Sequence, residues 1–219
     1  MKSAMQWTGA LLLAAAFGSS TAMAAPAHDG SGHAAATNKP VQAPKLQAAM
    51  RALWHGHEVH AREYALAMHA HKPVAAKAAA DAVVANAKQI SDAVAGFYGK
   101  AAGTRMLELL GGHWGAVKAM TDARATGDNA AADKATADLT ANAGEIAKFL
   151  AGANPNLPEA DVRGLLVAHG AHHLQQVQQI MAGDMRAEAQ TWKAMQQHMD
   201  TIADALAGAI AKQFPAKAA

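Results

Sequence analysis

The chain has 219 residues and a formal net charge of +2, with 12 histidines and no cysteine. The absence of cysteine excludes disulfides, thiolate zinc sites, iron–sulfur clusters and cysteine nucleophiles, and the small net charge argues against a nucleic-acid partner. Only 16% of the residues are charged and 5% are aromatic, and the abundant alanine that replaces them favours an all-α protein over a β-sandwich or barrel.

The first 24 residues have the pattern of a secretory signal peptide. Lys2 is their only charge, an apolar run covers residues 11–17, and Ala22-Met23-Ala24 is a small-x-small cleavage site. The apolar run ends too early to span a membrane, and no second run reaches the necessary length. We therefore expect a periplasmic or secreted protein with no membrane span after cleavage of residues 1–24.

A helical domain with a 56-residue repeat is expected over residues 45–215, after a disordered linker over residues 25–44 that is rich in proline, glycine and serine. Residues that recur at this spacing are Leu53, Leu109 and Leu165; His57, His113 and His169; Ile90, Ile146 and Ile202; and Gly96, Gly152 and Gly208. Since 56 residues are eight heptads, each set keeps one helical phase. The repeat predicts three tandem units, roughly residues 45–100, 101–156 and 157–214.

Each unit has the pattern of a helical hairpin. Apolar residues recur three and four positions apart in both halves of a unit, and glycine or proline interrupts the pattern near residues 73, 99, 127, 154–158 and 183. These interruptions predict an all-α bundle of six helices, each of about 22–28 residues, in three helical hairpins. A four-helix bundle with two helices added outside is the alternative, because sequence phase does not determine the lateral order of helices.

A polar layer crosses the apolar stripes near the middle of the predicted helices. The first helix of each unit carries a histidine there, and the second helix carries an asparagine or a histidine. The six residues are His57, His113 and His169, then Asn86, Asn142 and His198. Short connections make neighbouring helices antiparallel, so we expect all six side chains at one depth in the bundle.

Three motifs resemble those of an uncharacterised family of bacterial all-helical proteins, over about residues 50–215. They are Leu53-Trp54-x-x-His57, the run Asn142-Ala143-x-Glu145-Ile146-Ala147-x-Phe149-Leu150, and Gln213-Phe214-Pro215. The resemblance implies the family's single histidines at His57, His113, His169 and, more loosely, His198. His60 stands where the family more often has tryptophan, and His55, His172 and His173 are additional to its pattern. Similar sequences are sometimes labelled glycosyltransferases, but this chain has no alternating strand–helix pattern and no Asp-x-Asp motif.

The histidines of the polar layer indicate a transition-metal site. Imidazole is the commonest metal ligand, and three or four imidazoles form sites typical of zinc or copper. We expect a copper or zinc ion at His57, His113, His169 and His198, with Asn86 and Asn142 holding imidazole N–H groups in place.

A second, more exposed site is expected at His60, His172 and His173. These residues lie about one helical turn from the histidines of the layer, and imidazoles three or four residues apart on one helix face chelate a single ion.

Two other function classes compete with a metal-binding protein. The first is a structural or partner-binding module, in which Asn–His hydrogen bonds only determine helix register. The second is an enzyme, for which the sequence has no Gly-x-Ser-x-Gly motif, no phosphate-binding glycine loop and no Glu-x-x-His pair.

Overall fold

The structure is a computed structural model that describes residues 43–218; the predicted signal peptide and most of the predicted linker lie outside this range. Every regular element within it is a helix, which confirms the all-α prediction. The helices are α1 (Pro44–His69), α2 (Pro73–Tyr98), α3 (Lys100–Thr126), α4 (Asn129–Ala153), α5 (Glu159–Met181), α6 (Met185–Gln213) and α7 (Pro215–Ala218). The short α7 was not predicted, and α6, with 29 residues, is slightly longer than expected.

The long helices begin and end where proline, glycine and aspartate favour a helix terminus. Pro44 and Pro73 lie in the first turns of α1 and α2, where the missing proline N–H has no helical partner to lose. Helix α1 therefore begins at Pro44, the last residue of the predicted linker. Gly127 ends α3 in the left-handed conformation, and Asp128 and Asp184 accept backbone N–H groups from the first turns of α4 and α6.

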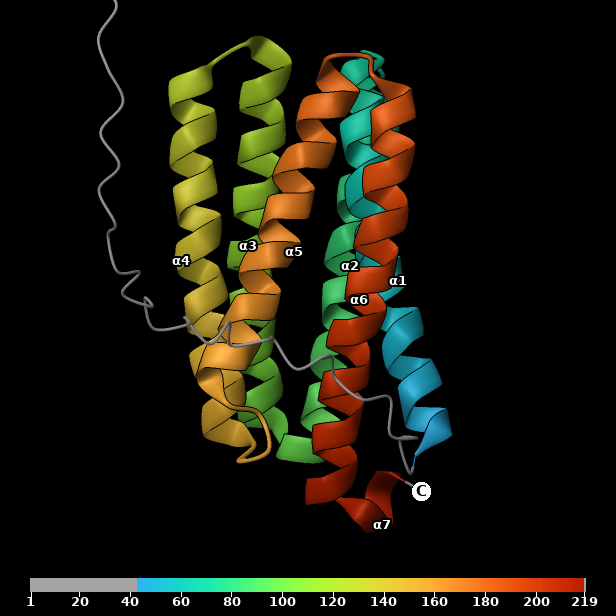
Figure 1. Cartoon of the computed structure of the whole chain (residues 1–219), viewed down its shortest axis with the longest axis vertical. Coiled ribbons are helices and arrows are strands. Elements are labelled where there is room, and N and C mark those ends of the chain that lie inside the picture. Colours follow the sequence, from blue (N-terminus) through green and yellow to red (C-terminus); the bar gives the residue numbers. More distant parts are fainter. Residues whose placement is uncertain (1–42, 219) are drawn as a thin grey trace, which may run out of the picture. The chain divides into compact units, whose positions relative to one another are not determined.

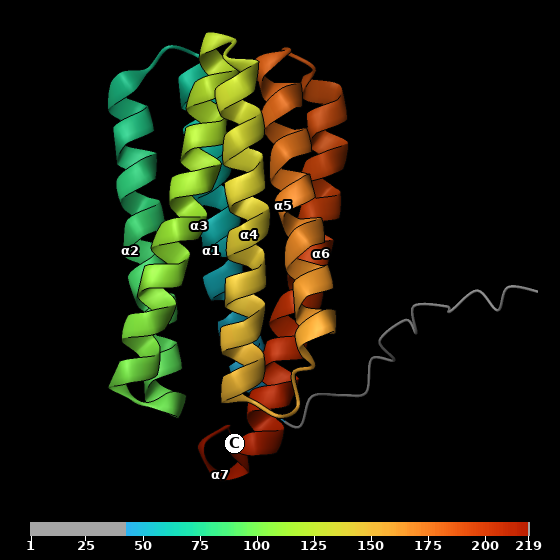
Figure 2. The same cartoon turned by 90° about the vertical axis from the view of Figure 1, so that its left-hand side faces the viewer.

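The six long helices run side by side (Figures 1 and 2). Each packs against its neighbours in the chain, and α6 returns to pack against α1, so the order closes into a ring. The odd-numbered helices also contact one another, α1 with α3 and α5, and α3 with α5. These three helices therefore form the inside of the bundle, and each even-numbered helix packs against two of them. None of the helices described for residues 43–218 is both long and apolar enough to cross a membrane.

Aliphatic and aromatic side chains form separate apolar clusters toward the two ends of the inner helices. One cluster includes Trp54, Leu110, Ile146, Leu166 and Ile202. Another includes Tyr64, Val83, Trp114, Val117 and Leu139. Many of the residues between the helices are fully buried alanines, whose small side chains let neighbouring helices approach closely. The predicted polar layer lies between the two apolar regions.

Side-chain amides join the outer helices α2 and α4 to the inner helices at this level. Asn86 Nδ2 donates to the carbonyl oxygen of Leu53 at 2.9 Å, and Asn142 Nδ2 donates to that of Leu109 at 3.0 Å. Both bonds join residues 33 positions apart in the chain. Each bond uses one of the two lone pairs of its carbonyl oxygen. Together the two bonds fix the position of each outer helix along the axis of its inner neighbour.

Glycine makes room for both amides. A Cβ at Gly56 would lie 2.8 Å from Asn86 Nδ2, and a Cβ at Gly112 would lie 2.9 Å from Asn142 Nδ2. Both separations are too short for a normal contact, so these glycines permit the close approach. No atom lies within 4 Å of a Cβ built at the neighbouring Gly111, so this glycine has no such packing role.

Alanine substitution of the two adjacent glycines in α3 tests this packing. Gly111→Ala is expected to raise the free energy of unfolding by up to about 1 kcal/mol, because alanine is the better helix former. Gly112→Ala is expected to lower it by about 1 kcal/mol, because the new methyl group displaces the Asn142 amide from its carbonyl. Urea unfolding at one pH compares the two variants, and equal stabilisation by both would contradict a packing role for Gly112.

Candidate metal centre

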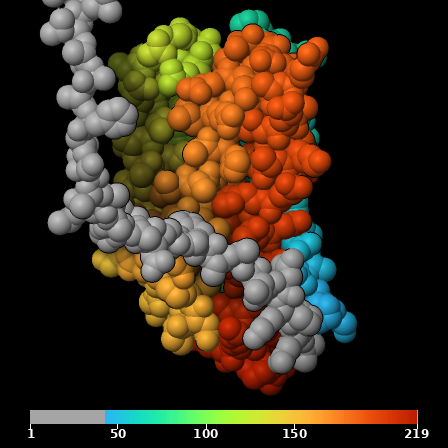
Figure 3. Space-filling model, viewed as in Figure 1, coloured from blue at the N-terminus to red at the C-terminus, as the bar shows by residue number. Residues whose placement is uncertain are grey.

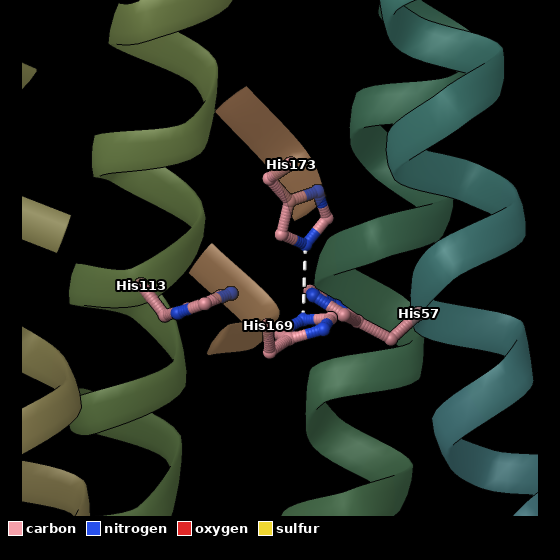
Figure 4. Close-up of side chains that lie close together, drawn as sticks. All are labelled: His57, His113, His169 and His173. Atoms are coloured by element: carbon pink, nitrogen blue, oxygen red, sulfur yellow. Dashed lines mark hydrogen bonds between the residues drawn. The ribbon is translucent and has the colours of Figure 1, made fainter. Parts of the chain in front are cut away.

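Four histidines from the three inner helices meet in the centre of the bundle. They are His57 from α1, His113 from α3, and His169 and His173 from α5, and their imidazoles point toward one another (Figure 4). One ring nitrogen from each lies within 4.8 Å of the others. The four residues are only 1–6% exposed. We call them the histidine cluster.

The cluster is only partly satisfied by internal hydrogen bonding. His169 and His173 share one hydrogen bond, with their Nε2 atoms 3.0 Å apart, so one of these two nitrogens carries the proton and donates it. His169 Nδ1 is buried and has no hydrogen-bond partner. An unpaired buried polar atom costs about 1–3 kcal/mol, and a ligand that engages the cluster would recover part of that cost.

The spacing of the cluster suits a single metal ion. Zinc holds imidazole nitrogens at about 2.0–2.1 Å, which places tetrahedral ligands roughly 3.3 Å apart and their ring centroids roughly 5 Å apart. The centroid separations in the cluster run from 4.5 Å to 6.0 Å. The four ligand nitrogens lie within 4.8 Å of one another. To reach the separation of about 3.3 Å in a tetrahedral site, any two of them need to approach by about 1.5 Å or less.

An apolar cavity of about 30 Å³ adjoins the cluster. His113 and His169 form part of its lining, together with Trp54, Met199 and aliphatic side chains of α3 to α6. Since one water molecule needs about 10–15 Å³ of such space, the cavity admits a molecule of very few atoms. It does not accommodate a haem or a flavin, so the cluster suits a bare ion rather than an organic cofactor.

Burial keeps the four imidazoles neutral. It lowers the pKa of His57 to about 3, with smaller contributions from His113 and His60, and it lowers the pKa of His113 to about 4. The pKa values of His169 and His173 also lie well below the usual 6.5, first because of burial and then because of the neighbouring imidazoles. Neutral imidazole is the form that coordinates metal, so at pH 7 the cluster is already in its binding form.

His173 takes the place in the cluster that the sequence analysis assigned to His198. His198 Nε2 lies 2.9 Å from the carbonyl oxygen of Leu165, the counterpart of the bonds that the two asparagines make in the other helix pairs. The side chain of His198 is therefore bound to the backbone of α5 and is not among the four imidazoles that converge. His173 lies four residues after His169 on α5. Residues at this spacing share one helix face, so the sequence did contain a signal that His173 lies on the same side of α5 as His169.

Asn86 and Asn142 lie beside the cluster, but they bind backbone carbonyls and not imidazoles. Their Nδ2 atoms donate to the carbonyl oxygens of α1 and α3, and their Oδ1 atoms are buried without a partner. The expectation that they orient the histidine rings is therefore wrong for the residues that the structure describes.

The three residues of the predicted second site are dispersed. His173 belongs to the cluster. His172 instead lies against His198, with ring centroids 5.4 Å apart. His60 Nδ1 lies 2.9 Å from a carboxylate oxygen of Glu63 on the same helix.

A buried carboxyl group next to His57 in the chain was not predicted from the sequence. Glu58 is 0% exposed. Burial raises its pKa to about 8, with a further contribution from Asp200 of α6, so this side chain is neutral at pH 7. The corresponding positions of the other two units are Trp114 and Gly170, and the repeat therefore provided no signal for it.

Comparisons with protein-family models, curated proteins and solved structures found no significant match for this chain. The geometry of the histidine cluster is therefore the main indication of function.

The metal-free protein is expected to lose stability in acid. The unfolded histidines take up protons near pH 6.5, whereas the cluster stays neutral to much lower pH, so the unfolded state binds more protons. The free energy of unfolding then falls with decreasing pH, by about 1.4 kcal/mol per pH unit for each buried imidazole. Urea unfolding between pH 7 and pH 5 measures this slope.

A matched variant tests the contribution of one imidazole to that slope. His173→Val introduces the residue found 56 positions earlier, at the buried Val117. It is expected to reduce the slope by about 1.4 kcal/mol per pH unit. An unchanged slope would mean that His173 is not buried as a neutral group.

The opposite pH dependence is expected from Glu58. Above pH 4.5 the unfolded carboxyl ionises while the folded one stays protonated to about pH 8, so Glu58 lowers stability progressively as the pH rises through this window. Glu58→Gln should therefore raise the free energy of unfolding clearly at pH 8 and little at pH 5. The control is Glu63→Gln on the exposed face of α1; equal effects of both variants at pH 8 would refute the buried, neutral carboxyl.

Proposed function

We propose that this chain is an exported, periplasmic protein that binds one copper or zinc ion in the histidine cluster. The observation that carries the proposal is the convergence of four buried, neutral imidazoles from three helices, with ligand atoms within 4.8 Å of one another. Four polar rings with one hydrogen bond among them are costly in an apolar core, whereas an ion would give each a partner. The signal-peptide pattern of residues 1–24 supports export.

The ligand chemistry supports copper or zinc. All four ligands are imidazoles, which suit zinc and copper, whereas calcium and magnesium prefer oxygen ligands. Met199 lines the cavity beside His113 and His169, and a nearby thioether favours the softer copper(I).

We further propose that the domain consists of three repeats of one helical hairpin, α1–α2, α3–α4 and α5–α6. Three hydrogen bonds at corresponding positions support this division. Each joins the second helix of a pair to the first across 33 residues, and successive bonds are 56 residues apart: Asn86 to Leu53, Asn142 to Leu109 and His198 to Leu165. Each hairpin then supplies one inward histidine, and the third supplies His173 as well.

Calorimetric titration of the mature protein with zinc(II), copper(II) and copper(I) tests the metal site. One tightly bound ion is expected in the cluster. His113→Leu and His173→Val each remove one ligand while keeping an apolar group in its place, and each should weaken that binding at least about tenfold. The ion should also stabilise the parent against heat, by about 2.7 kcal/mol at a free concentration 100 times the Kd.

The control is His69→Ala, which removes an exposed histidine at the end of α1 and should leave tight binding unchanged. Absence of binding by the parent would support the competing interpretation, in which the layer only determines helix register. Equal binding by the parent and the cluster variants would place the ion at surface histidines.

A further inference from the structure

A second pair of imidazoles lies between α5 and α6, outside the histidine cluster. His172 of α5 and His198 of α6 have ring centroids 5.4 Å apart, and both are half-buried. Helices α5 and α6 pack against each other and lie side by side on the face shown in Figure 3. Two imidazoles bound to one tetrahedral ion have centroids roughly 5 Å apart, so this pair is already close to a bidentate arrangement.

The carbonyl oxygen of Leu165 determines which nitrogen of His198 is free. A carbonyl only accepts hydrogen bonds, so His198 Nε2, at 2.9 Å, carries the proton. The lone pair of the neutral ring is then on Nδ1. Metal-binding imidazoles usually donate their other N–H to such an acceptor, which orients the ring and raises the basicity of the ligand nitrogen. His198 is therefore held in the form that binds metal through Nδ1.

This pair lies next to the histidine cluster. His172 directly precedes His173 in the chain and lies three residues after His169. The cluster residues are 1–6% exposed, so an ion from solvent has to pass more exposed groups before it reaches them.

Only the third helix pair has two imidazoles at these positions. The first pair has His60 and Asn86, and His60 is engaged with Glu63. The second pair has Ala116 and Asn142. The asparagines make the same bond to a carbonyl but offer no imidazole lone pair. The carbonyl bond therefore does not require histidine at position 198, and the imidazole there needs another explanation.

We propose that His172 and His198 form a second, solvent-facing site for copper(II) or zinc(II), from which the ion passes into the histidine cluster. This inference rests on the proposed function of the cluster. Two imidazoles leave the remaining coordination positions to water, so the ion is held more weakly there and exchanges faster than among four imidazoles. Such a pair raises the local concentration of the ion beside the cluster.

The double variant Ala168→Gly/His198→Asn tests the proposal. It reproduces the glycine and asparagine combination of the other two pairs, so the bond to the Leu165 carbonyl is kept while the ligand nitrogen is removed. Equilibrium dialysis with copper(II) alone should find two ions on the parent and one on the variant. Stopped-flow absorbance should show uptake into the cluster about tenfold slower in the variant, with the affinity of the tight site unchanged.

The control is His60→Ala, which removes the corresponding imidazole of the first pair and should change neither stoichiometry nor uptake rate. His172→Ala removes the other ligand of this site. Because His172 is half-buried, this change serves as a second, independent variant of the same site. An unchanged stoichiometry or an unchanged uptake rate in both site variants overturns the proposal.

A cluster variant separates this proposal from that of the tight site. His113→Leu should lose the tight ion and keep the weak one. A tight ion on the parent without a weak one would refute the outer site alone. A weak ion without a tight one would refute the cluster as a metal centre.

Discussion

The burial of four imidazoles between α1, α3 and α5 is the constraint on which the rest of this structure depends. Each neutral ring presents one donor and one acceptor, and the apolar residues above and below the layer satisfy neither. One hydrogen bond, between His169 and His173, is formed inside the cluster. The core is thus apolar enough to keep the rings neutral, and it leaves His169 Nδ1 buried without a partner, so an added cation would find a free lone pair there.

Hydrogen bonds at the level of the histidine cluster control how far the helices are shifted along one another. Asn86, Asn142 and His198 each bind a carbonyl oxygen of the neighbouring inner helix, and a shift by one turn would break all three bonds. Gly56 and Gly112 allow the approach that the two amides require. The outer helices therefore fix the positions of the inner helices along the bundle axis. As a result, the histidines of the inner helices meet at one point.

The third helix pair departs from the other two, and its departures concentrate imidazoles on one side of the bundle. His173 enters the cluster from α5, while His172 and His198 lie together at the boundary with α6. Helix α6 also pairs the buried Glu188 with the half-buried Arg62 of α1, at 2.6 Å, and Gln176 of α5 donates to the same carboxylate. Three helices are joined there by a satisfied ion pair, in contrast to the unsatisfied cluster nearby.

By itself, the sequence determined the features that depend on local chemistry and on phase. Pro73 begins a helix, and Gly99, Gly127 and Gly183, all with positive φ, lie where helices end, each through its own backbone restrictions. The 56-residue spacing gave His57, His113 and His169 one helical phase and one depth, because eight heptads preserve both. These parts of the fold and of the candidate site followed from residue identity and spacing alone.

Only the tertiary structure decided the direction in which side chains at that depth point. The sequence placed His198 in the layer and His173 one turn away in a second site. The actual arrangement depends on how α6 lies against α5, which brings the Leu165 carbonyl within reach of His198. The raised pKa of Glu58 likewise depends in part on Asp200 of α6, more than a hundred residues away in the chain. The lateral packing of the helices depends on many weak contacts between segments far apart in the chain. A local sequence pattern does not predict the combined effect of these contacts.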